Sequence, residues 1–270
     1  MSLSQITGRR AYPWYHDIVP FLGGLADPLM GITSATARFF RSFPLPHTAD
    51  TPRRRKRGIA FILGGIEGPS QRGRDMGMGL LRGGYRGAVS IFPWNRCVPV
   101  IGAFRNLTSR AHHEQQSDAL VTLVRRHRAE NPNSPVSFIA QSGGCFITVR
   151  TLEKLHHADG VAYAILLAPS ISPGFDIRPA ANRCSGGLYS LGGRGDYFFL
   201  GLGTMLFGTS DRVRTPSAGL VGWHHRHEKF HEVRWHPSWT RLGYLGNHIT
   251  TSCQRFIAEI IAPLLRSTRT

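Results

Sequence analysis

The segment SPVSFIAQSGGCFITVRTLEKL, residues 134–155, joins two different hydrophobic patterns at one short turn. The β-branched and aromatic residues at 136–139 indicate a short buried strand. The residues from 145 to 155 place apolar side chains at helical spacing, which predicts a helix with Phe146, Val149, Leu152 and Leu155 on its buried side. Ser142 therefore lies at a corner between a strand and a helix.

The residues around Ser142 have little bulk. Ala140 precedes it by two positions, and Gly143 and Gly144 follow it directly. A tight strand-to-helix turn needs such residues because its backbone passes close to neighbouring elements. The hydroxyl would project beside the amide groups that open a helix, where negative charge is favoured. Ser142 is thus a candidate nucleophile, and the alternative role is an ordinary helix N-cap.

The rest of the chain alternates strand-like and helix-like segments. Apolar runs at 58–65, 87–94 and 160–170 are strand candidates, and residues 108–130 predict a long helix. Nearly continuous apolar strands that alternate with helices are typical of a parallel sheet covered on both faces. We expect an α/β fold with a mostly parallel central sheet of about six strands flanked by helices.

The AQSGG corner resembles the nucleophile elbow of the α/β-hydrolase superfamily, with Ala140 in place of the first glycine of the commoner GxSxG form. This resemblance implies a hydrolase-like domain over residues 57–265, preceded by an N-terminal extension and basic linker at 1–56. Residues 197–230, rich in glycine and aromatic residues, would contain a small lid lining an apolar acyl pocket.

The superfamily order of catalytic residues is Ser, acid, His. His248 is the last histidine and precedes an amphipathic C-terminal segment, so the resemblance implies that it is the base. Asp196 follows a strand-like segment and is the preferred acid, with Asp211 as its rival. A base and an orienting carboxylate are needed because a serine hydroxyl is a poor nucleophile until its proton is removed.

A second glycine-rich loop, FILGGIEGPSQRG, follows the first strand candidate. In the superfamily the corresponding loop donates one oxyanion-hole amide, and the residue after the nucleophile donates the other. The resemblance therefore implies an oxyanion hole formed by the amide of Gly65 or Ile66 together with that of Gly143. The phosphate-binding pattern GxxxxGK[ST] is absent, so a nucleotide loop is not expected here.

The stretch HHRHEKFHEVRWHP, residues 224–237, contains the HExxH spacing at His227, Glu228 and His231. In metalloproteases this spacing puts two zinc ligands and a base on one face of a helix. Apolar and polar residues alternate in this stretch, which indicates a strand late in the chain, so we expect neither a zinc site nor a cofactor. If a metal binds here, the alternative is chelation at the surface by His224, His225 and His227.

The charge distribution and the absence of targeting patterns bear on which partners and which compartment we expect. The chain carries 33 Lys plus Arg against 16 Asp plus Glu, with the densest run RRRKR at 53–57. The arginines are scattered without an aromatic-interleaved stripe, so no specific nucleic-acid partner is expected. Four separated cysteines without a CxxC pair favour a reducing compartment, and no signal peptide or transmembrane segment is seen. We expect a cytoplasmic protein.

Together these features predict a serine hydrolase that cleaves carboxylic esters or lipid-like acyl substrates through Ser142, His248 and Asp196. The alternatives are an acyltransferase or thioesterase, and a noncatalytic binding protein with a hydrolase-like fold, because a fold alone does not establish activity.

Overall fold

The computed structural model describes residues 18–28, 44–67, 70–95 and 109–266. Six strands of this described chain form one sheet in the order β2-β1-β3-β4-β5-β6, and every neighbouring pair is parallel. The expected fold class, a parallel sheet flanked by helices, is confirmed. The strands are β1 (Ile59–Leu63), β2 (Ala88–Ile91), β3 (Val136–Gln141), β4 (Val161–Leu167), β5 (Cys184–Gly192) and β6 (Phe230–Arg234).

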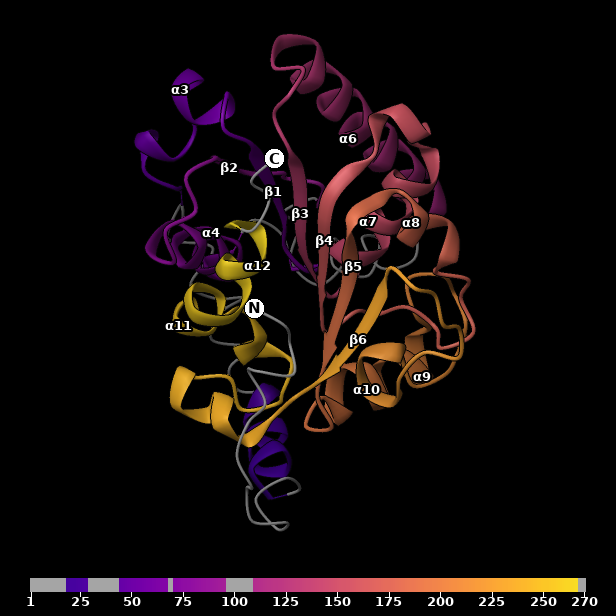
Figure 1. Cartoon of the computed structure of the whole chain (residues 1–270). Helices are drawn as coiled ribbons and strands as arrows, with labels where there is room; N and C mark the ends of the chain where they lie inside the picture. The colour runs from indigo at the N-terminus through magenta and orange to yellow at the C-terminus, as the bar shows by residue number, and fades with distance from the viewer. Residues whose placement is uncertain (1–17, 29–43, 68–69, 96–108, 267–270) are drawn as a thin grey trace.

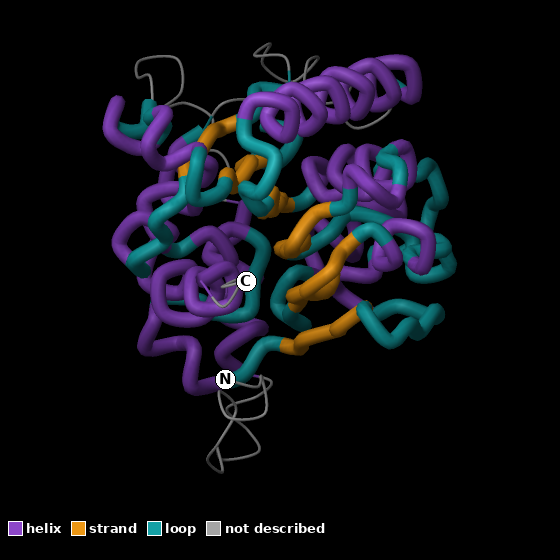
Figure 2. Tube along the Cα trace, turned by 45° about the horizontal axis from the view of Figure 1, so that its top comes forward, coloured by secondary structure: helices purple, strands orange, loops and turns teal. Residues whose placement is uncertain are grey.

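Helices cover both faces of the sheet (Figures 1 and 2). One face carries α6, α7 and α8; the other carries α4 and the C-terminal elements α11, η6 and α12. The helices on these two faces are α4 (Gln71–Arg82), α6 (Arg110–Glu130), α7 (Gly143–Lys154), α8 (Arg178–Asn182), α11 (Gln254–Phe256), η6 (Ile257–Ile261) and α12 (Ala262–Arg266). Further helices lie in the connecting segments: η1 (His47–Ala49), α3 (Pro52–Arg55), η2 (His157–Asp159), η3 (Tyr197–Gly203), α9 (Thr204–Phe207), α10 (Ala218–Val221), η4 (Pro237–Leu242) and η5 (Ile249–Ser252).

The central strands are buried on both faces because helices cover both. In β1, Ile59, Phe61 and Leu63 enter the core beneath α6 and α7, whereas Ala60 and Ile62 enter the core beneath α4 and the C-terminal elements. This alternation follows from the two-residue period of a strand. It explains why the strand candidates read as continuous apolar runs instead of alternating ones.

The strand order reverses direction between β1 and β3. The chain passes from β1 to β2 on one side and then returns across the sheet to β3 on the other. Ligands of open α/β sheets bind beyond the carboxyl ends of the strands at such a reversal. Leu63 pairs in register with Ala140, so the loops that follow β1 and β3 leave the sheet side by side.

Candidate active site

Ser142 occupies the turn between β3 and α7 in a conformation that residues with a side chain rarely adopt. Its φ is 53° and its ψ is −123°. Its amide donates to the Leu167 carbonyl (2.9 Å), which anchors the turn to β4. The turn is also crowded, because a Cβ on Gly144 would lie 2.5 Å from the Gly64 carbonyl oxygen. A non-glycine residue held at positive φ stores strain, and such strain concentrates at functional sites.

The loop after β1 lies directly against this turn. A Cβ on Gly65 would lie 3.4 Å from the Cβ of Ser142, and one on Gly143 would lie 2.7 Å from Cγ2 of Ile66. The residues predicted to form the oxyanion hole are therefore brought together around Ser142. Their role as donors stays a prediction.

The side chains of Trp94 and Asn95 hold the backbone of this loop. The Trp94 indole Nε1 donates to the Gly64 carbonyl (2.8 Å), and the Asn95 amide donates to the Gly65 carbonyl. Both residues follow β2, the strand next to β1. With its carbonyl groups turned toward these donors, the loop has a fixed backbone beside Ser142.

The loop after β1 is also held by an ion pair between Glu67 and Arg72, which the sequence patterns did not predict. Arg72 Nε donates to Glu67 Oε1 (2.9 Å), and the Ser70 hydroxyl donates to the same oxygen (3.0 Å). Burial by itself would raise the pKa of Glu67, but the charge and hydrogen bond of Arg72 outweigh it and hold that pKa below its usual value. Arg72 lies in the first turn of α4, so the pair ties the loop to that helix.

His248 and Asp196 form a buried pair. Nδ1 of His248 lies 2.5 Å from Oδ2 of Asp196, and the side chains are 9% and 1% exposed. Burial raises the pKa of the Asp196 carboxyl to about 6, although the His248 charge opposes this. Burial lowers the pKa of the imidazole, but the charge and hydrogen bond of Asp196 outweigh it, so the His248 pKa lies above its ordinary value. The carboxylate fixes which ring nitrogen carries a proton.

The rival acid, Asp211, has different partners. Its carboxylate accepts hydrogen bonds from the amide of Ser172 (2.8 Å) and from the Ser172 hydroxyl. Asp196 lies four residues beyond the end of β5 and also caps η3 through the Leu200 amide (3.2 Å). Of the two candidates, Asp196 is the one that contacts His248.

Gln141, the last residue of β3, connects the serine turn to the histidine loop. Its Nε2 donates to the carbonyl oxygen of His248 (3.0 Å) and to Thr251 Oγ1 (3.1 Å). Among the described residues, no hydrogen bond joins the Ser142 hydroxyl to the imidazole. Catalytic hydrogen bonds are often long before substrate binds and shorten in the complex.

The HExxH residues do not share a helix. His227 precedes a turn, and His231 lies on β6, where its ring packs 4.6 Å from that of Tyr189. On a strand and its leading turn, the two imidazoles cannot occupy successive turns of one helix face as a metalloprotease motif requires. The expected late strand at this position is confirmed.

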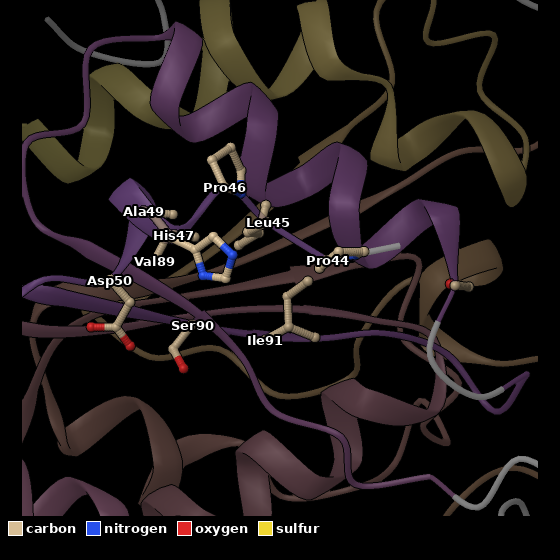
Figure 3. Close-up of a pocket in the computed structure, with 10 residues that line it drawn as sticks. Pro44, Leu45, Pro46, His47, Ala49, Asp50, Val89, Ser90 and Ile91 are labelled. Atoms are coloured by element: carbon tan, nitrogen blue, oxygen red, sulfur yellow. The ribbon is translucent and has the colours of Figure 1, made fainter. Parts of the chain in front are cut away.

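A cavity among the described residues lies away from these three side chains. It has a volume of about 420 Å³ and lies between the 44–50 segment and β2, with His47, Asp50 and Ser90 on its wall (Figure 3). It includes none of the three predicted catalytic side chains.

No described helix has the length and apolar character needed to cross a bilayer.

Comparison with known proteins gives structural likeness only. No family model matches the chain, and no curated protein matches it. Similar solved structures include a Xanthomonas campestris α/β serine hydrolase without a lid, at 14% identity and a TM-score of 0.47, covering 85% of this chain and 88% of that one. Aspergillus fumigatus lipase B has 11% identity, a TM-score of 0.48 and coverages of 82% and 55%. A Pyrococcus furiosus esterase has 12% identity and a TM-score of 0.46, and the match covers 77% of this chain and 82% of that one.

Proposed function

We propose that the chain is a serine hydrolase acting on carboxylic esters, with Ser142 as nucleophile, His248 as base and Asp196 as the carboxylate that orients the imidazole. The observation that carries the proposal is the pairing of a strained serine turn with a buried His–Asp pair, joined through Gln141. Neither feature is needed to fold a parallel sheet. A serine nucleophile requires a base that a third group orients, and the strained turn exposes the hydroxyl in the way that a nucleophile elbow does.

In the proposed reaction His248 accepts the Ser142 hydroxyl proton while the serine oxygen attacks the ester carbonyl. The resulting oxyanion is stabilised by the Gly143 amide and by the amide of Gly65 or Ile66; one such donor is worth about 10² to 10³ in rate. Collapse of the intermediate breaks the ester C–O bond, and His248 gives its proton to the leaving alcohol. Water then attacks the acyl-enzyme by the same route and regenerates Ser142.

An apolar acyl group is the favoured substrate moiety because an aromatic ring borders the base and its helix continues into an exposed apolar segment. The ring of Phe199, in η3, lies 5.0 Å from that of His248. The same segment, which continues into α9, exposes Phe198, Leu202, Met205, Leu206 and Phe207. Exposed apolar clusters of this kind mark ligand or interaction sites. These side chains support the proposal of a small lid within residues 197–230. Thioester hydrolysis and acyl transfer are the alternative reactions, because they use the same acyl-enzyme.

A fluorophosphonate probe tests the proposal directly, because it reacts with an activated serine hydroxyl. We expect covalent labelling of the full chain, and loss of labelling together with ester turnover in Ser142→Ala. Ser137→Ala is a matched control, since Ser137 is also buried and lies on β3, the strand that leads into the Ser142 turn. Folded protein that is not labelled would refute the enzymatic proposal and favour a noncatalytic binding protein.

A further inference from the structure

A fully buried carboxylate from the N-terminal helix contacts the backbone of the histidine loop. Asp27 lies in the helix over residues 18–28 (indigo in Figure 1). Its Oδ2 accepts a hydrogen bond from the His248 amide (3.0 Å). Its Oδ1 accepts from the Ile249 amide (3.2 Å) and from Asn247 Nδ2 (2.7 Å). All three partners are donors, so an ionised carboxylate, which only accepts, satisfies every one of them.

The helix that carries Asp27 is held against both loops of the His–Asp pair. A Cβ on Gly24 would lie 2.2 Å from the Gly195 carbonyl oxygen, beside Asp196. On the other side, Asn247 Nδ2 donates to the Gly23 carbonyl (2.9 Å). Only a helix with glycine at this contact can approach so closely. The position of Asp27 is therefore set by packing on the same residues whose geometry it affects.

His248 is consequently held at three points. Asp27 accepts from its amide, Gln141 donates to its carbonyl oxygen, and Asp196 binds its Nδ1. The first two contacts fix the backbone amide and carbonyl, and the third fixes the ring. We propose that Asp27 is a positioning residue, which holds the His248 backbone so that the imidazole stays aligned with Asp196 and Ser142. This inference rests on the proposed function for its catalytic consequence.

Asp27 also influences the charge of the imidazole. Among the described residues, the charged groups that act on His248 are Asp196, beyond β5, Asp27, on the N-terminal helix, and Arg72, on α4. The two carboxylates raise the pKa of His248, while burial and Arg72 lower it. Removing the charge of Asp27 should therefore lower that pKa and move the acid limb of activity to lower pH.

Asp27→Asn separates positioning from bulk, because it keeps the side-chain volume but replaces one acceptor oxygen with a donor. One of the amides at His248 and Ile249, or the Asn247 side chain, must then face a donor instead of an acceptor. We expect kcat for a p-nitrophenyl ester to fall about 10²-fold, the cost of a misplacement near 1 Å, with KM nearly unchanged. Asp50→Asn is the matched control, since Asp50 pairs with Arg55 and should leave kcat and the pH profile unaltered.

The decisive readout does not depend on turnover. The His248 imidazole is titrated by NMR in the wild type and in Asp27→Asn, with the resonance assigned by its absence in His248→Gln. A lower His248 pKa and a shifted Nδ1 proton in Asp27→Asn support the inference. Unchanged imidazole resonances, or a fall in unfolding temperature with kcat and the acid limb intact, would overturn it by leaving only a structural role.

Failure of the two proposals can be told apart. If the wild type is not labelled by the fluorophosphonate but the NMR difference is present, the proposed hydrolase activity fails and the positioning of His248 stands. If Asp27→Asn does not fold, amide hydrogen exchange of the wild type provides the test. The His248 and Ile249 amides should then be protected, and exchange at the rate of free loop amides would contradict the inference.

Discussion

Gln141 donates a hydrogen bond from its side-chain amide to the carbonyl oxygen of His248, across 107 positions of sequence. Gln141 is the residue before the proposed nucleophile, so the strand that presents Ser142 also holds the loop that presents the base. The donor and acceptor are both buried, and the same carbonyl oxygen also accepts a hydrogen bond from Thr251 Oγ1 (2.9 Å). This contact makes the relative position of the serine turn and the histidine loop a property of the core.

The acid assignment predicts an unequal response of two aspartates. Asp196→Asn should lower ester turnover by up to about 10⁴-fold, because an amide cannot hold the imidazole in the required tautomer. Asp211→Asn should retain near wild-type kcat, since that carboxylate bonds to Ser172 instead. Steady-state kinetics of both variants provide the check, and the reverse ranking would transfer the role to Asp211.

The proposed base predicts a rise of activity with pH. His248 must be neutral to accept the serine proton, and its pKa is raised above the ordinary imidazole value of about 6.5. The protonated fraction therefore persists above that pH, and kcat/KM should climb through one deprotonation whose midpoint exceeds 6.5. The midpoint is measured from a profile of kcat/KM against pH. His248→Ala should remove this titrating limb, and an unchanged profile in that variant would exclude His248 as the base.

Serine and zinc chemistry make opposite predictions for chelators. EDTA should leave ester hydrolysis intact, because the proposed mechanism uses no metal. His227→Ala with His231→Ala should retain activity and cost about 1 kcal/mol of stability, mainly through the lost packing of His231 on Tyr189. Activity that disappears with EDTA and returns with zinc would refute the serine mechanism.

The positive φ of Ser142 predicts that replacing this residue with glycine abolishes activity but relieves backbone strain. Ser142→Gly and Ser142→Ala both remove the hydroxyl, so both should be inactive. Only glycine relieves the backbone strain at φ 53°, and it should be the more stable of the two by about 1 kcal/mol in urea unfolding. Because glycine also loses more backbone entropy on folding, a Ser142→Ala variant that is more stable than Ser142→Gly would contradict strain at this turn.

Local patterns predicted much of this fold. The long helix expected at 108–130 is α6 (Arg110–Glu130), and the stretch around His231 is a strand, as its alternation indicated. These predictions succeeded because the period of apolar residues records which face of an element is buried. Small residues around Ser142 likewise indicated a tight turn before any partner was known, since a crowded backbone leaves no room for bulk.

The partners of the site residues were decided only by the tertiary structure. Asp196 follows β5 and Asp211 follows α9, and both lie in small-residue loops, so the local sequence could rank the two acids but could not show which of them contacts His248. Asp27 interrupts an apolar stretch, yet its partner His248 is 221 positions away. A sequence period states that a residue is buried but not what it meets. The contacts of Asp27, Gln141 and Asp196 with His248 exist because strand order and helix packing bring distant segments to one end of the sheet.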